Sequence, residues 1–145
     1  MSKKRFWWSV FAVWFVMMVT NWFFHDVWLV SWYQQTSQFW RSTEEIQGML
    51  PLMAFGTFIF SWAFVWIYSK GISNDNPWTQ AFRYALAILL VAKVPDQIET
   101  WIVSPYPAEL VLRWGFVSLV QAFACAYVMT WTFKPVPNWT KATHH

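Results

Sequence analysis

Residues 51–69 read PLMAFGTFIFSWAFVWIYS and contain no charged side chain. A helix needs about 20 mainly apolar residues to cross the hydrocarbon core of a bilayer. This stretch therefore predicts a membrane-spanning helix. The composition agrees, because 57% of the 145 residues are hydrophobic and only 12% are charged. Such a chain has too little polar surface for a soluble domain and too much apolar content for a disordered one.

Three further stretches have the same character, at residues 6–33, 78–103 and 107–133. Only short polar connections separate the four apolar segments, so almost no chain is left for a soluble domain. The sequence predicts an all-α membrane protein with four transmembrane helices, in which residues 1–145 form a single membrane-embedded domain. One cysteine, Cys125, excludes an intrachain disulfide and a four-cysteine metal site.

The residues that flank the segments fit helix ends. Lys70 and Gly71 place a cation and then a glycine at the end of the second segment. Asn76-Pro77 is typical of a helix start, and Pro107 precedes the fourth segment in the same way. Lys134-Pro135 predicts the end of that segment.

The connection between the first two segments contains a local helix signal. Ser42 and Glu45 have the spacing of a capping box, in which each side chain bonds the backbone N–H of the other residue. Pro51 disfavours helical geometry at Leu50. The sequence therefore predicts either a short interfacial helix that ends near Leu50 or an irregular interfacial loop.

Basic residues near the segment ends indicate the orientation. If four spans alternate, one side holds Lys3, Lys4, Arg5, Lys70, Lys134 and Lys141. The other side holds Arg41 and Arg113, with Glu44, Glu45 and Glu109 beside them. The positive-inside rule then predicts that both termini are cytoplasmic. The net charge of +3 is too small to indicate a nucleic-acid partner.

Several short motifs are shared with a known group of proteins. They are Trp40-Arg41-x-x-Glu44-Glu45-x-x-x-Met49-x-Pro51, Tyr68-x-Lys70-Gly71, Arg83-Tyr84, Pro105-x-Pro107, Trp114 and Lys134-Pro135. With these motifs the chain resembles a group of small bacterial four-helix membrane proteins that have no assigned function. That group tends to carry glycines beside the Arg-Tyr pair, where this chain has Ala81 and Ala85. The resemblance implies a bacterial origin and a membrane location, and it implies no reaction. We expect that membrane to be the bacterial inner membrane.

Polar residues gather near the predicted outer ends of the segments, at His25, Asp26, Asp96, Glu99 and Glu109. In one interpretation these groups are interfacial: Glu109 pairs with Arg113, and Lys93 pairs with Asp96 or Glu99. In the other, His25, Asp26, Asp96 and Glu99 hold a divalent metal, since imidazole and carboxylates are suitable ligands. No close ligand spacing such as His-x-x-x-His supports the metal site. Pro95 predicts a kink that would turn Asp96 toward the bundle axis.

Two patterns predict contacts between helices. Gly115, Ser118, Ala122 and Ala126 place small side chains along one part of the fourth segment, and such stripes favour close helix packing in membranes. Together with Ala81, Ala85 and Ala92 of the third segment, they predict that the third and fourth segments form the packed hairpin. Asn21, inside the first segment, is expected to hydrogen-bond a neighbouring helix.

The sequence favours a non-catalytic function. It contains no Gly-x-Gly-x-x-Gly, no P-loop and no His-Glu-x-x-His motif, and no cofactor is predicted. We expect an accessory or assembly subunit of a larger bacterial membrane complex, in contact with lipid and with other subunits or further copies of the chain. The alternatives are transport of an ion, proton or small solute, and a metal-binding membrane protein that uses the His25 cluster.

Overall fold

The computed structural model describes residues 2–71 and 76–133, which form helices and contain no strand. Lys134, Pro135 and Lys141, which entered the predictions above, lie outside the described residues. The elements in order are α1 (Lys3–Asn21), the π-helical η1 (Trp22–Trp28), α2 (Val30–Gln35), the 3-10 turn η2 (Ser37–Phe39), α3 (Thr43–Lys70), α4 (Pro77–Ile88), the π-helical η3 (Leu89–Lys93), α5 (Val94–Val103) and α6 (Ala108–Thr132).

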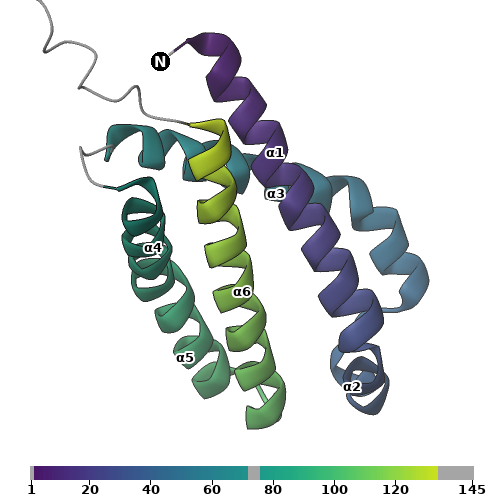
Figure 1. Ribbon diagram of the computed structural model, residues 1–145. Coiled ribbons are helices and arrows are strands. Elements are labelled where there is room, and N and C mark those ends of the chain that lie inside the picture. The colour runs from purple at the N-terminus through teal and green to yellow at the C-terminus, as the bar shows by residue number, and fades with distance from the viewer. Residues whose placement is uncertain (1, 72–75, 134–145) are drawn as a thin grey trace, which may run out of the picture.

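Three helices are long and apolar enough to span a membrane, which fits a membrane protein. They are Lys3–Trp28, Thr43–Lys70 and Ala108–Thr132. The third predicted segment, 78–103, corresponds to α4, η3 and α5, which follow one another without a break (Figure 1). This helix carries Arg83, Lys93, Asp96 and Glu99, so its composition alone does not mark it as a span.

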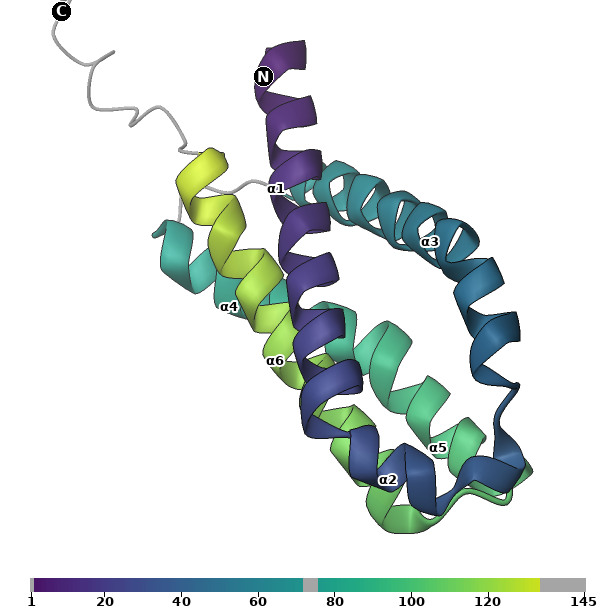
Figure 2. The same ribbon diagram turned by 90° about the vertical axis from the view of Figure 1, so that its right-hand side faces the viewer.

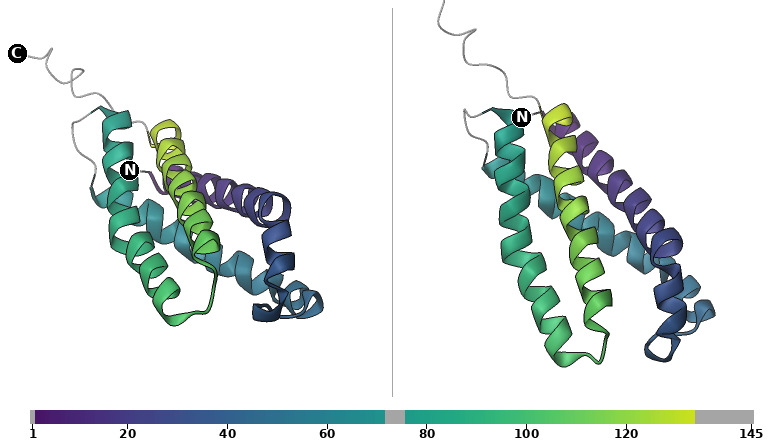
Figure 3. Two further views of the ribbon diagram at one scale, coloured as in Figure 1. Left: turned by 90° about the horizontal axis from the view of Figure 1, so that it is seen from below. Right: turned by 60° about the horizontal axis from the view of Figure 1, so that its bottom comes forward.

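The chain runs back and forth between the two ends of the molecule (Figure 1). It passes away from the N-terminus in α1, returns in α3, leaves again in α4 and α5, and returns in α6. Figure 3 shows α4 and α5 running alongside α6. The opposite end holds α2 and the connection between α5 and α6, and is called the α2 end below.

The core lies where α6 packs between α1 and α4, with α3 packed mainly on α1. Ala122 and Ala126 of α6 are buried there together with Ala81 and Ala85 of α4. Small side chains let the two helices approach closely, as the alanine pattern predicts. The rest of the small-residue pattern does not pack as predicted: Ala92, in η3, is exposed, and Gly115 and Ser118 are only half-buried. A Cβ added to Gly115 would meet no atom within 4 Å.

The prediction of a short separate helix or a loop before Pro51 is wrong. The capping box is present, with Ser42 Oγ 3.2 Å from the Glu45 N and Glu45 Oε2 3.2 Å from the Ser42 N. From that cap α3 continues through Pro51 to Lys70. Proline removes one backbone hydrogen bond, and a helix absorbs that loss by bending. Figure 2 shows the first part of α3 turned relative to the rest.

Two π-helical segments widen the helices, η1 at the end of α1 and η3 within the helix Pro77–Val103. η3 ends two residues before Pro95, whose ring would clash with the carbonyl of Val91 in a regular α-helix. The wider turn relieves that clash, so the helix continues into α5. At η1 the Leu29 N donates to the Phe24 O, 2.8 Å away and five residues back. The first predicted segment, 6–33, therefore divides at Leu29 into a long helix and the short α2.

Candidate functional site

The His25 and Trp114 side chains meet at the hydroxyl of Tyr33 at the α2 end. The His25 Nδ1 lies 2.5 Å from the Tyr33 phenol oxygen, and the two rings stack with 9° between their planes. The same oxygen accepts a 2.9 Å hydrogen bond from the Trp114 Nε1 of α6. A hydroxyl can accept one bond and donate another, so Tyr33 can accept from the indole while it donates to the imidazole. Tyr33 thus joins η1, α2 and α6 at a single atom.

Aromatic rings from the connecting segments surround this hydroxyl. Trp40 stacks on Tyr106 at 5.2 Å between ring centroids, and both rings contact Trp114 edge-on. The Trp40 Nε1 donates to the Thr36 Oγ1 at 2.9 Å, which positions the indole over α2. We call His25, Tyr33, Trp40, Tyr106 and Trp114 the Tyr33 cluster. It brings together the two connections at the α2 end.

Arg113 lies beside the Tyr33 cluster and fixes α2 against α6. Its guanidinium carbon is 4.4 Å from the centre of the Trp32 ring, a cation–π distance. Its Nη2 donates to the Glu109 Oε1 at 2.8 Å, as the i, i+4 spacing predicts. The Arg113 Nε is buried without a hydrogen-bond partner, so the residue's charge is balanced mainly through its terminal nitrogens.

Burial affects the ionisation of Tyr33. Desolvation disfavours the phenolate, so it raises the pKa of Tyr33 above its usual range. The hydrogen bond from Trp114 acts in the opposite direction, because an indole N–H stabilises the phenolate, but its effect on this pKa is smaller. Tyr33 is therefore protonated at neutral pH and keeps a proton to donate to His25.

The predicted metal ligands are not brought together. His25 is half-buried against Tyr33, whereas Asp26, Asp96 and Glu99 are exposed. Among residues 2–71 and 76–133, no three His, Cys, Asp or Glu side chains are grouped where they could hold a metal ion. The metal site therefore stays a prediction, and the described part of the chain shows no group of ligands for it.

Lys93 does not form the predicted pair with Asp96 or Glu99. Its ammonium instead lies 5.6 Å from the centre of the Phe60 ring of α3. Lys93 ends η3, and the half-buried side chain extends toward α3 while both carboxylates are exposed. Within the described residues, the ion pair of Arg113 with Glu109 is the only one, and it does not involve Lys93. Lys93 is thus a cation inside the bundle with an aromatic ring as its neighbour.

A second polar contact joins α1 to α6 within the spanning helices. The Gln121 Nε2 donates to the Asn21 Oδ1 at 2.7 Å and to the Thr20 Oγ1 at 3.1 Å. The expected bond of Asn21 to a neighbouring helix is therefore present. Gln121 did not enter the sequence predictions, although a glutamine inside an apolar segment is a signal for such a bond.

Comparison of the chain with protein-family models, with curated proteins and with solved structures finds no match. The function proposed below therefore depends on the chain's own geometry.

Proposed function

We propose that this chain is a non-catalytic subunit of a larger membrane protein complex, with helix Pro77–Val103 as a fourth span and both termini cytoplasmic. The observation that carries the proposal is Lys93, a cation inside the bundle that forms no ion pair with a carboxylate of residues 2–71 and 76–133. A partner subunit would supply the missing negative charge. The bacterial inner membrane is the proposed location, following the resemblance described above.

Lys93 lies far from both ends of the helix Pro77–Val103, so it would lie deep in the membrane if this helix spans it. It lies sixteen residues after Pro77 and ten before Val103. At 1.5 Å per residue, these separations are about 24 Å and about 15 Å along the helix axis. The lysine stem has only four carbons, so the ammonium does not reach the nearer helix end.

An unpaired ammonium at this depth is unfavourable. Insertion scales give a cost of about 2.5–3.5 kcal/mol for a charged residue near the centre of a spanning helix. A ring face offsets part of this cost, because a cation–π contact contributes roughly 0.5–2 kcal/mol. A carboxylate from another protein would offset the rest. Charged residues in spanning helices commonly form such pairs.

Exposed faces of α1 and α3 support the same proposal. Each face repeats large apolar side chains at alternating spacings of three and four residues, the heptad spacing of helices that pack side by side. On α1 these are Trp8, Phe11, Phe15 and Met18, followed by Trp22 at the start of η1; on α3 they are Leu52, Phe55, Ile59, Trp62 and Trp66. All ten are exposed, and they offer two helical surfaces to neighbouring helices.

The test is purification from native membrane in mild detergent, with the co-purifying proteins quantified by mass spectrometry. Wild type is expected to retain partner proteins at a fixed ratio, and Lys93→Met is expected to lose them. Lys70→Met is the matched control, because Lys70 is an exposed cation 5.8 Å from the Trp66 ring at a helix end. A wild-type chain that runs alone as a monomer contradicts the proposal. So does an unchanged set of partners with Lys93→Met.

A further inference from the structure

We propose that a pocket at the start of α1 binds the phosphate headgroup of an anionic phospholipid. The pocket has a volume of about 540 Å³ and is lined by Ser2, Lys4, Arg5, Trp7, Trp8 and Phe11. This volume lies within the range of about 300–1,000 Å³ that is typical of small-molecule sites. The pocket shares Trp8 and Phe11 with the exposed α1 face described above, but it includes neither the Tyr33 cluster nor Lys93, whose contact carries the proposed function.

The charge of the pocket is uncompensated. Lys4 and Arg5 are both exposed, and neither forms an ion pair within residues 2–71 and 76–133. No acidic residue precedes Asp26 in the sequence, so the first turns of α1 carry only positive charge. Basic residues beside a spanning helix attract anionic lipid headgroups. A phosphate group is the complementary ligand, because both side chains donate only.

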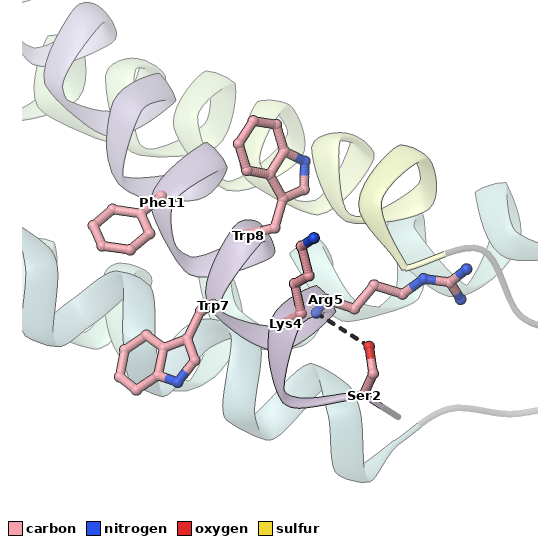
Figure 4. Close-up of a pocket in the computed structure, with 6 residues that line it drawn as sticks. All are labelled: Ser2, Lys4, Arg5, Trp7, Trp8 and Phe11. Atoms are coloured by element: carbon pink, nitrogen blue, oxygen red, sulfur yellow. Dashed lines mark hydrogen bonds between the residues drawn. The ribbon is translucent and has the colours of Figure 1, made fainter.

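The aromatic residues place this charge at the height of lipid headgroups. Trp7 and Trp8 are 46% and 67% exposed, and they lie in the second turn of α1, where the apolar segment begins. Indole rings prefer the membrane–water interface, where one face is apolar and the N–H is wet. Figure 4 shows Lys4 and Trp8 projecting to the same side of α1, while Arg5 extends away from Trp7 and Phe11.

The depth of the pocket favours a lipid over a soluble phosphate. Phe11 is half exposed and lies one turn deeper than Trp7, inside the apolar segment. A ligand that fills the pocket therefore contacts cations at one end and a ring within the hydrocarbon at the other. A phospholipid has this polarity, with a phosphate joined to acyl chains. Ser2 already caps the helix through the Arg5 N at 3.3 Å, so the site depends on side-chain charge.

The experiment measures lipid retention in nanodiscs made from equal parts of phosphatidylcholine and phosphatidylglycerol. Native mass spectrometry of the released protein counts each bound lipid. We expect wild type to retain phosphatidylglycerol preferentially, and Lys4→Gln and Arg5→Gln each to weaken that preference about fivefold. Trp8→Leu is expected to weaken it as well, although it changes no charge. Lys70→Gln removes one exposed cation outside the pocket and is expected to leave the preference unchanged.

Two outcomes overturn the proposal. An equal decrease of the phosphatidylglycerol preference in Lys4→Gln, Arg5→Gln and Lys70→Gln would show that the lipid is attracted by the overall charge of the protein. An unchanged preference in every variant would show that the pocket holds no anionic lipid. A second arm adds inorganic phosphate at matched ionic strength to the detergent-solubilised protein with its retained lipid. Loss of the lipid would show a site for any phosphate, whereas retention supports a site that needs the whole phospholipid. Because the substituted positions are exposed, helix content by circular dichroism should be equal in all variants.

Discussion

The indole N–H of Trp114 donates to the hydroxyl of Tyr33, a residue 81 positions earlier in the chain. This 2.9 Å bond joins α6 to α2, and the same hydroxyl contacts the His25 Nδ1. Two neighbouring segments, η1 and α2, and the distant helix α6 therefore depend on one oxygen atom. The relationship identifies Tyr33 as the residue whose loss affects the α2 end most directly.

Removal of that hydroxyl should destabilise the protein. Tyr33→Phe keeps the ring but leaves the Trp114 N–H and the His25 imidazole without this partner. A buried polar group that loses its partner costs about 1–3 kcal/mol. We expect a loss in this range in the free energy of unfolding, measured by SDS titration in mixed micelles.

Tyr127→Phe serves as the matched control for Tyr33→Phe. Tyr127 is also half-buried, and its ring contacts Trp78 and Phe123. Its hydroxyl forms no hydrogen bond to the described residues. The substitution should change the unfolding free energy by less than about 0.5 kcal/mol. Equal effects of the two substitutions would contradict the central position of Tyr33.

The Tyr33 hydroxyl also predicts a pH dependence at the alkaline end. Burial raises the pKa of Tyr33 in the folded protein above the ordinary tyrosine value of about 10. The folded state therefore holds this proton more tightly than the unfolded state. The resulting stabilisation is fully present below pH of about 10 and is lost as the pH rises through the folded pKa.

The absorbance of tyrosinate measures this ionisation. The difference between wild type and Tyr33→Phe isolates one tyrosine of the five in the chain. We expect the difference signal to appear only above the range in which free tyrosine ionises. A difference signal centred below pH of about 10 would show that the hydroxyl is not buried as the structure has it.

Gln121 and Asn21 should be energetically coupled across α1 and α6. Gln121→Leu leaves the Asn21 Oδ1 without its 2.7 Å bond, at a cost of about 0.6–1.7 kcal/mol for such contacts in membranes. Thr20 is affected less, because its hydroxyl also donates to the Val16 backbone oxygen at 2.8 Å.

The double variant Gln121→Leu with Asn21→Leu decides whether the bond is the cause. When both polar partners are replaced by apolar groups, the change can be nearly neutral. We therefore expect the double variant to be more stable than the sum of the two single losses predicts. Simple additivity in a double-mutant cycle would mean that the two residues do not interact.

The metal content of the purified protein tests whether the predicted ligands bind a metal ion. His25 contacts Tyr33, and Asp26, Asp96 and Glu99 are exposed. We expect elemental analysis of purified wild type and of His25→Ala to give the same metal content. Stoichiometric metal in wild type that is lost in His25→Ala would instead support the ligand set and would require the helices to rearrange.

Local signals in the sequence predicted local features of the structure. The capping box at Ser42, the helix start at Pro77 and the pair of Glu109 with Arg113 each involve residues within four positions of one another. Such features depend on backbone geometry and spacing alone. The long apolar runs likewise predicted helices of sufficient length to cross a membrane.

Features that depend on contacts between distant segments were not predictable. Pro51 predicted a helix end, but α3 continues through it because one lost hydrogen bond is offset by the turns on either side. Tyr33 gave no signal, since one tyrosine among many aromatic residues near a helix end is unremarkable in sequence. The contact of Lys93 with Phe60 depends on where η3 turns the side chain, and the spacing to Asp96 indicated a different partner.

The side of the membrane on which Ala108 lies decides whether the chain has three or four membrane-spanning helices. Residues Pro77–Val103 run alongside α6 through the molecule, yet only three helices are apolar enough to be recognised as spans from composition. If Pro77–Val103 crosses the membrane, the start of α6 lies on the same side as η2. If it does not cross, the start of α6 lies on the opposite side from η2.

Cysteine labelling measures these positions in a Cys125→Ala background. Single cysteines at Ser2, Gln38 and Ala108 are all at exposed positions. With four spans and a cytoplasmic N-terminus, an impermeant maleimide should label Gln38→Cys and Ala108→Cys in intact cells, and Ser2→Cys only after lysis. Labelling of Gln38→Cys alone would mean that Pro77–Val103 stays on one side. Lys93 would then lie outside the bilayer, and its lack of a carboxylate partner would no longer indicate a partner subunit.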